Sequence, residues 1–331
     1  MRVTAIVPVW NRVELLEKLL LKLRAQSRPP EEVLVVDNGS IDGSAGAAER
    51  LGARVIRMGR NAGFAPAINQ GIREARTEAV AVINNDVEPS PDWLGRLVEA
   101  LEDPNAWFAC GKLLDARDRR RIDGTYDLYC RGGAAWRAGH GRPDGPAFDS
   151  PRPAAMASFT ASLFRAELFR RIGPLDEGFI SYLEDVDFGL RCAQGGCAGV
   201  YVPRAVAWHV GSATLGRWNR EVVRALARNQ IVLIAKHYPP PLARRLAWPI
   251  LVAQALWGLV AVRHGSGIAW LRGVLEGLRR MKRIRRAQPD NAAAFSRILI
   301  QGEAEILRIQ RETGFDRYWR LYFFLTGGAS D

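Results

Sequence analysis

The stretch AVAVINNDVE, residues 79–88, decides how this chain of 331 residues folds. Its first five residues are small or β-branched and apolar, without polar alternation, which is typical of a strand buried on both faces of a parallel sheet. Asn84, Asn85 and Asp86 follow at once, and ligands of open α/β sheets bind beyond the carboxyl ends of the strands. Their oxygen atoms suit a hard divalent cation that also takes phosphate oxygens as ligands. The alternative is an ordinary turn, because Asn and Asp are common turn residues.

The region before this stretch alternates apolar strands with helices. Buried strands are predicted at 3–9 and 33–36, with a third, shorter strand at 54–58, and each leads into a segment with helical character. Asn11 and Asp42 are the expected caps of the first two helices. The alternation, at intervals of roughly 25 residues, predicts an α/β fold with a mostly parallel twisted sheet and right-handed crossovers.

Two of these strands end in carboxylates. Asp37 closes the second predicted strand, so Asp37 and Asp86 are expected at the same edge of the sheet, the usual layout for holding a nucleotide. The sequence has neither a GxGxxG after the first strand nor a Walker A loop, so it lacks both glycine-rich phosphate cradles. The phosphate charge would be met by another group, and a metal ion at Asp86 is the obvious candidate.

The middle of the chain is less regular. Residues 115–153 are rich in Arg, Gly, Asp and Pro, which favours a flexible functional loop over a domain linker because strand-like sequence resumes at 157–164. Two further short strands are predicted at 200–202 and 205–210. His209 lies near the end of the second.

The net charge of +12 suggests nucleic acid, an anionic membrane or phosphorylated ligands as partners. The excess is local, because residues 236–331 have 16 Lys and Arg against 7 Asp and Glu. The four cysteines form neither a CxxC pair nor a zinc-site spacing, and the chain opens directly on a strand rather than on a secretory signal. Reduced thiols in a cytosolic setting are therefore expected.

Six motifs together resemble the family 2 glycosyltransferases, and within them the bacterial rhamnosyltransferase-like branch. Their order and spacing over residues 3–215 carry the resemblance, since each motif alone is weak. The motifs are IVPVWNR at 6–12, VVDNGSIDGS at 35–44, NAGFAPAINQGI at 61–72, INNDV at 83–87, GPLDEGFISYLEDVDFGLR at 173–191 and WHVGSAT at 208–214.

The resemblance implies a GT-A fold and inverting transfer of a sugar from a nucleoside-diphosphate sugar. The expected catalytic domain is 1–215, with a nucleotide-sugar half at about 1–112 and an acceptor half at about 113–215, followed by a helical extension at 216–331. The residues that it implies for nucleotide-sugar binding are Pro8 and Trp10 at the base, Asp37 at the pyrimidine edge, Asn61, Gly63 and Asn69 at the ribose and diphosphate, and the amides Asn84 and Asn85.

Asn84-Asn85-Asp86 stands where the family has a metal-binding DxD motif, with an amide in place of the first acid. Asp86 is the implied direct ligand, and Asn84 would contribute through water or the ribose. This departure argues against a cation held tightly by protein alone and is compatible with Mg or Mn held mostly by the donor diphosphate. His209 corresponds to a late histidine that completes the metal site or touches the diphosphate in several relatives; a structural histidine beside Trp208 is the alternative.

Inverting transfer needs a base that takes the proton from the acceptor hydroxyl. Asp185 matches the family's base position, and the neighbouring Glu184 and Asp187 are expected to raise its pKa through like-charge repulsion. The alternative is a helix N-terminus that simply favours acidic residues. That alternative does not explain the whole GPLDEGF…EDVDF pattern.

The C-terminal third changes character. Leu246 to Val262 contains 17 residues without a charge, somewhat short of the about 20 that a spanning helix needs, so a re-entrant or interface-lying helix is an equal alternative. A cluster of basic residues follows this segment. It could contact an anionic membrane or form a solvated helix face, and no recognition motif supports nucleic-acid binding. The predicted contacts to an anionic membrane surface are Arg279, Arg280, Lys282, Arg283, Arg285 and Arg286.

These observations predict an inverting, metal-dependent glycosyltransferase on the cytoplasmic side of the cell membrane, attached peripherally. The resemblance favours dTDP-rhamnose as donor, with UDP-hexoses next, and a lipid-linked saccharide acceptor in cell-surface polysaccharide assembly. A non-catalytic nucleotide-sugar-binding subunit is a second hypothesis, since the first acid of the DxD motif is missing. A basic RNA- or DNA-binding protein is a third, and only the localised charge supports it.

Overall fold

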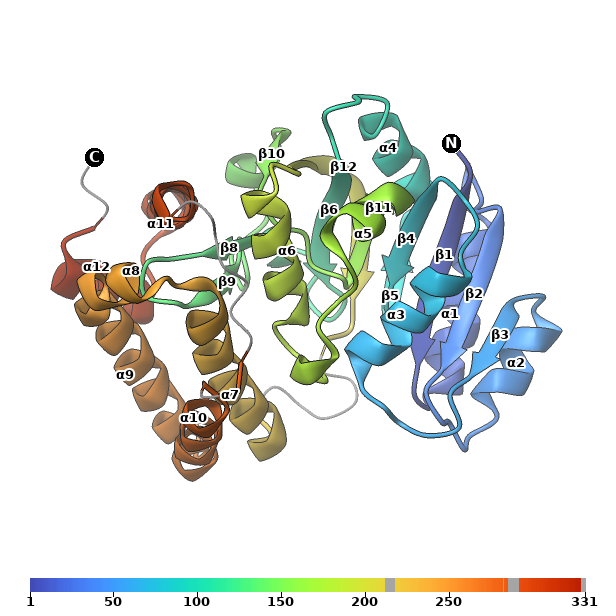
Figure 1. Ribbon diagram of the computed structural model, residues 1–331. Coiled ribbons are helices and arrows are strands. Elements are labelled where there is room, and N and C mark those ends of the chain that lie inside the picture. Colours follow the sequence, from blue (N-terminus) through green and yellow to red (C-terminus); the bar gives the residue numbers. More distant parts are fainter. Residues whose placement is uncertain (212–217, 282, 285–291, 329–331) are drawn as a thin grey trace. The chain divides into compact units, whose positions relative to one another are not determined.

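The computed structural model describes residues 1–211, 218–281, 283–284 and 292–328. The chain divides into two compact units. The sheet unit comprises Met1–Asp127 and Gly139–Gly211, and the helical unit comprises Leu128–Ala138 and Ser212–Asp331. The strands and helices of each are shown in Figure 1.

The sheet unit is built on one ten-stranded sheet, and the predicted strand at 79–83 lies inside it. This strand, β4 (Ala79–Ile83), is buried at all five positions and pairs in parallel with β1 (Val3–Val9). β2 (Glu32–Asp37) and β3 (Arg54–Arg57) continue the parallel half. The prediction of a mostly parallel sheet is confirmed, and the all-apolar run of β4 follows from its burial on both faces.

The second half of the sheet mixes directions. β11 (Ala161–Arg165) runs antiparallel to both β4 and β6 (Phe108–Asp115), and β12 (Gly199–His209) runs parallel to β6. The order along the sheet is β10-β12-β6-β11-β4-β1-β2-β3. The short strands are β5 (Val87–Pro89), which pairs with β12, β7 (Ile122–Gly124), which pairs with β6, and the edge strand β10 (Arg152–Ala154).

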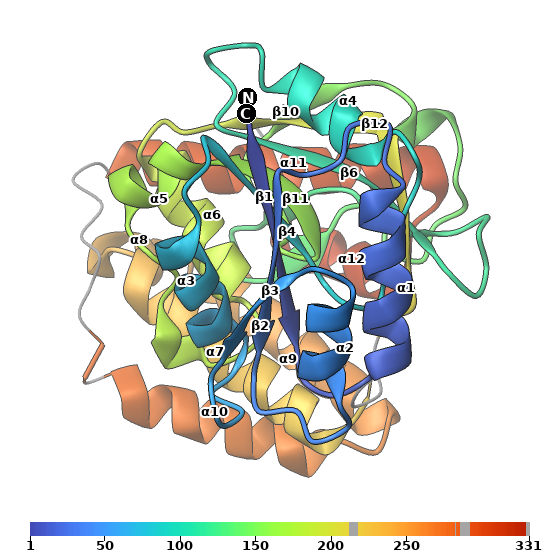
Figure 2. The same ribbon diagram turned by 90° about the vertical axis from the view of Figure 1, so that its right-hand side faces the viewer.

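Helices cover both faces of this sheet. Figure 2 shows α1 and α2 on one face and α3, α5 and α6 on the other. Leucines at helical spacing on α1 pack against the strands and against α4 in one hydrophobic core. The bounds are α1 Val13–Arg24, α2 Ser44–Arg50, α3 Phe64–Glu74, α4 Trp93–Ala100, α5 Ala166–Ile172 and α6 Glu184–Gln194, with short 3-10 helices at Pro146–Phe148 and Glu177–Phe179.

The start of α1 differs from the prediction that Asn11 caps it. Asn11 and Arg12 both have left-handed backbone angles, with φ of 60° and 67°, and the Asn11 side chain accepts instead from the Ile41 backbone N–H at 3.0 Å. The Val13 N–H donates to Asp42 Oδ2 at 2.9 Å. Asp42 also accepts from the N–H of Ser44, the first residue of α2. One carboxylate therefore supports the beginnings of two helices.

Two other predictions are corrected. Residues 200–202 and 205–210 are not two strands, because β12 is continuous and only its register with β6 shifts between Val202 and Val206. Pro203 has no N–H to donate to the ladder at this point. Residues 115–153 are not an irregular loop, because they contain β7, β8 (Asp127–Tyr129), β9 (Ala135–Arg137) and the beginning of β10.

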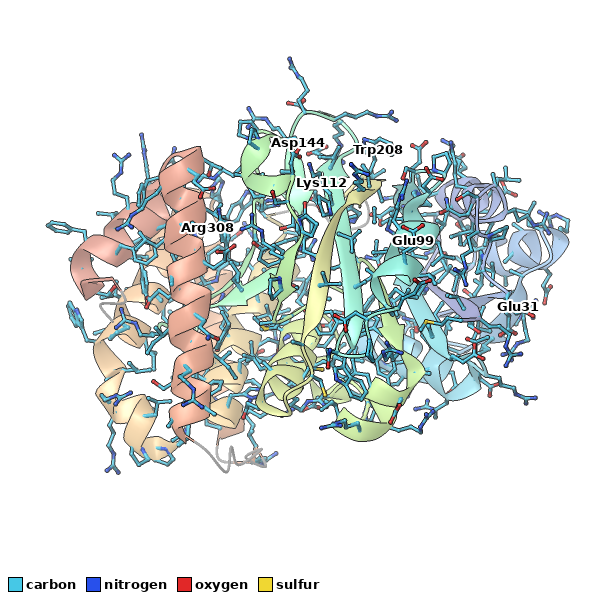
Figure 3. The ribbon with its side chains drawn as sticks, turned by 90° about the horizontal axis from the view of Figure 1, so that it is seen from above. Glu31, Glu99, Lys112, Asp144, Trp208 and Arg308 are labelled. Carbon is cyan, nitrogen blue, oxygen red and sulfur yellow. The ribbon has the colours of Figure 1, made fainter. Side chains whose placement is uncertain are left out.

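A buried lysine holds part of this middle segment on the sheet. Lys112, on β6, has a side chain that is only 6% exposed, and its Nζ lies 2.7 Å from carboxylate oxygens of both Asp144 and Asp149. Figure 3 shows Lys112 beside Asp144. A buried ammonium without partners would be costly, so the two carboxylates of the segment are fixed where the lysine emerges.

The helical unit encloses a hairpin that lies far away in the sequence. The hairpin pairs β8 with β9, and Arg131 at its turn forms an ion pair with the fully buried Glu303. The Tyr238 hydroxyl donates to the Cys130 carbonyl oxygen at 3.1 Å. The helices are α7 Arg220–His237, α8 Pro240–Arg245, α9 Ala247–Arg263, α10 Gly267–Met281, α11 Ala292–Thr313 and α12 Arg317–Thr326.

Within the described ranges, no helix is both long and apolar enough to cross a membrane. Three of the predicted membrane-contact residues, Arg279, Arg280 and Arg283, are exposed at or just after the end of α10. The other three, Lys282, Arg285 and Arg286, lie outside the described residues.

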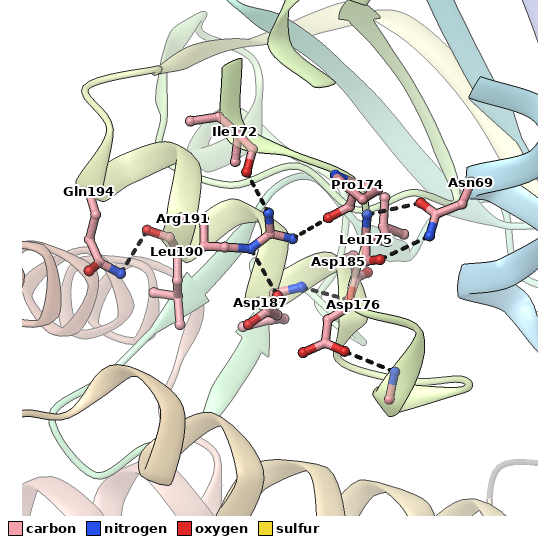
Figure 4. Close-up of polar contacts among 12 residues, drawn as sticks. Asn69, Ile172, Pro174, Leu175, Asp176, Asp185, Asp187, Leu190, Arg191 and Gln194 are labelled. Atoms are coloured by element: carbon pink, nitrogen blue, oxygen red, sulfur yellow. Dashed lines mark hydrogen bonds and ion pairs between the residues drawn. The ribbon is translucent and has the colours of Figure 1, made fainter. Parts of the chain in front are cut away.

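In the sheet unit, Asn69 on α3 holds the segment that leads to α6. Its Nδ2 donates to the Leu175 carbonyl oxygen and to Glu177 Oε1, and its Oδ1 accepts from the Leu175 N–H, each at 2.9 Å (Figure 4). Asn69 is 2% exposed, so no water replaces these bonds if the amide is lost. The amide thus fixes the position of residues 175–177.

We expect Asn69→Leu to lower the free energy of unfolding by about 3 kcal/mol, because it leaves the buried N–H and carbonyl oxygen of Leu175 without partners. Urea denaturation followed by tryptophan fluorescence measures this loss. Arg73→Leu, at an exposed position of the same helix, is the control and should change the value by less than about 0.5 kcal/mol. Equal midpoints for the two variants would contradict the assigned role of Asn69.

Candidate functional site

The ends of β1 and β2 bring three predicted nucleotide-binding residues together. Val9 pairs with Asp37, and Pro8 pairs with Val36, so the two strands end side by side. Asp37 is 5% exposed, and its Oδ1 accepts from the Ser40 N–H at 2.9 Å. Trp10, directly after β1, is 40% exposed. A buried carboxylate next to an open aromatic ring is a suitable lining for a nucleobase.

A second asparagine, Asn38, ties the predicted Asn61–Gly63 turn to this edge. Its Nδ2 donates to Asn61 Oδ1 and to the Gly63 carbonyl oxygen, each at 3.0 Å, and its Oδ1 accepts from the Ala62 N–H at 2.9 Å. The sequence did not single out Asn38. The signal was its position, since it directly follows the carboxylate that ends β2.

Gly63 is required by a close approach of the backbone. Its φ is 102°, and a Cβ at this position would lie 2.6 Å from the Ile180 carbonyl oxygen. The Ala65 N–H donates to that same oxygen at 3.2 Å. The beginning of α3 is thereby joined to the segment that precedes α6.

The polar tip after β4 lies between strands from distant parts of the sequence. The Asn84 N–H donates to the Thr160 carbonyl oxygen at 2.9 Å, and the Val210 N–H donates to the Asp86 carbonyl oxygen at 3.0 Å. Asn85 Nδ2 is 3.4 Å from the Asn11 carbonyl oxygen. Among the described residues, the buried Asn84 Oδ1 has no hydrogen-bond partner. This oxygen is a ready acceptor for a group that is bound there.

Asp86 and His209 meet at this tip, and a third residue, Asp123, stands behind the histidine. His209 Nε2 is 3.3 Å from Asp86 Oδ1, and its Nδ1 is 2.8 Å from Asp123 Oδ2. All three side chains are between 11% and 14% exposed. Burial by itself lowers the pKa of His209, but the hydrogen bonds and charges of Asp123 and Asp86 outweigh it and raise the pKa to about 9.

Asp123 was not predicted from the sequence. It lies on β7, in the segment without a motif, and only the pairing of β7 with β6 brings it to the end of β12. His140, also without a motif, places its Nδ1 2.7 Å from the Asp123 carbonyl oxygen.

These residues fit a divalent cation in part. No group of three or more His, Cys, Asp or Glu suited to a metal ion occurs in the part of the chain that the structure describes. Asp86 and His209 are nevertheless close enough to act as two ligands, and a carboxylate on the second nitrogen is the usual support of a metal-binding histidine. The arrangement suits a cation whose remaining ligands are a bound diphosphate and water.

The predicted catalytic acids begin α6. Glu184 is 5% exposed, and its Oε2 has no hydrogen-bond partner among the described residues. Burial raises the pKa of Glu184 well above its ordinary value, and the charges of Asp185 and Asp187 raise it further. Asp185 Oδ1 accepts from the Val186 N–H at 2.9 Å.

Asp187 and Arg191 hold this end of α6 in place (Figure 4). Asp187 is fully buried, and its Oδ2 is 3.0 Å from Arg191 Nε. The guanidinium also donates to the carbonyl oxygens of Ile172 and Pro174, at 2.9 and 2.8 Å. Asp187 therefore positions the helix, and Glu184 and Asp185 lie with it in the first turn of α6.

The segment just before these acids is strained. The backbone φ angles of Ile180, Tyr182 and Leu183 are 66°, 71° and 67°, values that residues other than glycine rarely adopt. Such outliers persist only where the surroundings enforce them, and they concentrate at functional sites. Ile180 and Tyr182 are also 44% and 36% exposed, which leaves an apolar surface next to the acidic pair.

The chain is similar to known glycosyltransferases in sequence. Residues 4–173 match the model of Glycosyl transferase family 2. The chain is 28% identical over 272 residues to the N-acetylglucosaminyl-diphospho-decaprenol L-rhamnosyltransferase of Mycobacterium tuberculosis, a match that covers 75% of this chain and 89% of that protein. It is 25% identical over 305 residues to the pre-mycofactocin glycosyltransferase of the same species, covering 90% and 60%.

Solved structures share the fold. The mannosyltransferase PcManGT of Pyrobaculum calidifontis, in complex with GDP-Man and Mn2+, has a TM-score of 0.53 at 21% identity and covers 98% of this chain and 86% of its own. GalNAc-T7 with UDP, GalNAc and Mn2+ has a TM-score of 0.59 at 11% identity and covers 99% and 56%. The expectation of a GT-A fold is confirmed, and the chain belongs to glycosyltransferase family 2.

Proposed function

We propose that this glycosyltransferase transfers rhamnose from dTDP-rhamnose to a lipid-linked saccharide, with inversion at the anomeric carbon. The acceptor would serve cell-surface polysaccharide biosynthesis, and the enzyme would act at the cytoplasmic face of the cell membrane. Similarity over 89% of an N-acetylglucosaminyl-diphospho-decaprenol L-rhamnosyltransferase supports rhamnose as the transferred sugar and a lipid-linked saccharide as the acceptor class. The observation that carries the chemistry is the acidic beginning of α6, where Glu184 is buried beside Asp185.

In the proposed reaction Asp185 is the base. Its carboxylate takes the proton of the acceptor hydroxyl while that oxygen forms a bond to the anomeric carbon, on the face opposite the leaving group. The bond from the anomeric carbon to the diphosphate breaks at the same time, and the nucleoside diphosphate leaves with the electron pair. Inversion follows from this single displacement.

The role that we propose for Glu184 differs from the expected like-charge repulsion of Asp185. Burial raises the pKa of Glu184, so its carboxyl group favours the neutral form and can donate a hydrogen bond. That neutral carboxyl group would lie beside Asp185, the proposed base. We assign Glu184 to orienting the acceptor hydroxyl beside Asp185.

The diphosphate end of the donor would lie at Asp86 and His209, with Asn84, Asn85 and the Asn61–Gly63 turn at the ribose and phosphates. A divalent cation, Mg or Mn, held by Asp86 and His209 would neutralise charge on the departing diphosphate. Asp123 keeps the His209 ring oriented toward Asp86 through its bond to Nδ1. Pro8, Trp10 and Asp37 would hold the base, while Asn69 acts on the site through residues 175–177.

Asp185→Asn should lower transfer by at least about 100-fold and leave dTDP affinity unchanged, because the amide cannot accept the proton. Transfer is measured with radiolabelled dTDP-rhamnose and binding by calorimetry. Glu167→Gln, an exposed acid on α5, is the matched control and should retain full activity. More than a few per cent of residual transfer in Asp185→Asn would remove Asp185 from the base role.

Glu184→Gln should raise the melting temperature at pH 8 while it lowers transfer. An acid whose pKa is raised by folding loses stability as pH rises above its unfolded value of about 4.5, and glutamine removes that loss. The difference from the unsubstituted protein should therefore vanish at or below pH 4.5. If Glu184→Gln instead melts at a lower temperature at pH 8, the carboxylate stabilises the helix N-terminus and the catalytic interpretation fails.

Binding of dTDP, UDP and GDP with and without Mn2+, followed by donor hydrolysis, distinguishes the functional hypotheses. We expect dTDP to bind most tightly, Mn2+ to strengthen it at least about tenfold, and dTDP-rhamnose to be hydrolysed slowly. Tighter binding of UDP favours a UDP-hexose donor. Binding without hydrolysis or transfer favours a non-catalytic subunit.

Two variants examine the cation ligands in the same panel. His209→Ala should abolish the effect of Mn2+ on dTDP affinity. Asp123→Asn should raise the Mn2+ concentration needed for this effect by about 10- to 100-fold. Asp92→Asn, at an exposed position just before α4, is the control and should leave the Mn2+ effect unchanged. An unchanged Mn2+ effect in His209→Ala would assign His209 a structural role only.

A further inference from the structure

Helix α10 is built the opposite way from a helix at a water-facing surface. Figure 2 shows it on the outside of the helical unit. Its buried residues are small: Ala269, Gly273 and Gly277 face α7, and a Cβ at Gly277 would lie 2.7 Å from the Cβ of Ile231. Its large apolar residues point outward instead: Ile268, Leu271, Leu275 and Leu278 are 73%, 50%, 43% and 47% exposed. Small residues between helices with large apolar residues outside are typical of helices that contact lipid.

Helix α9 repeats the arrangement. Trp248, Leu251, Leu259 and Val262 are 56–65% exposed, and they recur at helical spacing along the whole helix. No charged residue occurs from Leu246 to Val262, so the helix is apolar on its buried and exposed sides alike. A helix of this composition is normally enclosed by protein or lipid.

The two apolar stripes meet where the helices join. Gly258 lies beneath the Trp270 ring, and the Val262 side chain lies against Gly267, at the beginning of α10. We call the large apolar residues that are exposed on these two helices the apolar face. It consists of Trp248, Leu251, Leu259, Val262, Ile268, Leu271, Leu275 and Leu278. Contiguous exposure of this kind marks an interaction surface, whereas single exposed apolar residues need no explanation.

The charges beside the apolar face are positive. Arg272 and Arg279 are exposed and follow Ile268 and Leu275 by four residues, so they lie next to the stripe on the same side of α10. Arg263 is exposed at the end of α9. The one acid on α10, Glu276, is engaged by Arg224, with 2.6 Å between Nη2 and Oε1. The surface therefore complements a negatively charged, apolar partner.

We propose that the apolar face docks on an anionic phospholipid bilayer, with its side chains at the boundary of headgroups and acyl chains and its arginines at lipid phosphates. In this attachment the helices lie in the membrane interface and do not span the bilayer. Among the described residues, no helix is long and apolar enough to cross a membrane. The inference rests on the proposed function, in which the enzyme acts at the surface of the cell membrane. It replaces an attachment by the basic cluster alone with one in which apolar contact and charge act together.

A second copy of the chain is a poorer occupant. Two such faces in contact would bring Arg263, Arg272 and Arg279 of each copy against the same residues of the other, and like charges oppose that pairing. A bilayer with anionic lipids gains from the same charges, and its interior accommodates the apolar stripe without a matching shape.

Co-sedimentation of the full chain with vesicles of phosphatidylcholine, alone or mixed with phosphatidylglycerol, tests the proposal. The full chain should bind only the mixed vesicles firmly. Leu271→Gln with Leu275→Gln should weaken binding by at least about tenfold. Arg272→Gln with Arg279→Gln should weaken it by about 25-fold at low salt and by much less at high salt. Leu21→Gln, a 54% exposed leucine on α1, is the matched control and should bind normally.

Three results would overturn the proposal: no binding by the unsubstituted chain, equal binding by the double leucine variant, or a dimer that this variant dissociates in light scattering. Melting temperatures verify that the variants fold. Transfer to an acceptor with a short, water-soluble tail separates this inference from the proposed function. Transfer without vesicle binding overturns the docking face alone, and vesicle binding without transfer overturns the proposed function alone.

Discussion

The site depends on the burial of β4. Because Ala79–Ile83 is enclosed on both faces, the first polar groups of this stretch can emerge only at the edge of the sheet. There the backbone of Asn84 bonds to Thr160, just before β11, and that of Asp86 bonds to Val210, just after β12, so residues far away in the sequence fix the turn. A carboxylate held in this way needs little ordering when a charged ligand arrives.

The same logic extends to the acids of α6. Asn69 and Gly63 on the nucleotide side each contact the segment between residues 175 and 183, which ends in the acidic pair. The strained backbone at Ile180, Tyr182 and Leu183 and the buried carboxyl of Glu184 both lower stability. Sites that violate local rules in this way are usually kept for chemistry, as the proposed transfer requires.

Features that depend on local interactions could be predicted from the sequence, whereas features that depend on long-range contacts could not. The strand at 79–83 and the exit at Asp37 were predictable because apolar runs and strand ends are local signals. The cap of α1 was not, because Asp42 reaches it from a separate loop. Asp123 and the hairpin at 128–138 were also missed, since only long-range pairing, of β7 with β6 and of Arg131 with Glu303, gives them their places.

The central claim is a single displacement by an acceptor hydroxyl on a nucleotide-linked rhamnose. The most direct measurement is the anomeric configuration of the product, determined by NMR after the purified chain has acted on dTDP-rhamnose and an N-acetylglucosaminyl-diphospho-lipid acceptor. The account predicts a rhamnosyl product whose configuration is opposite to that of the donor. A product that retains the donor's configuration, or no rhamnosyl product under conditions where dTDP binds, would contradict it.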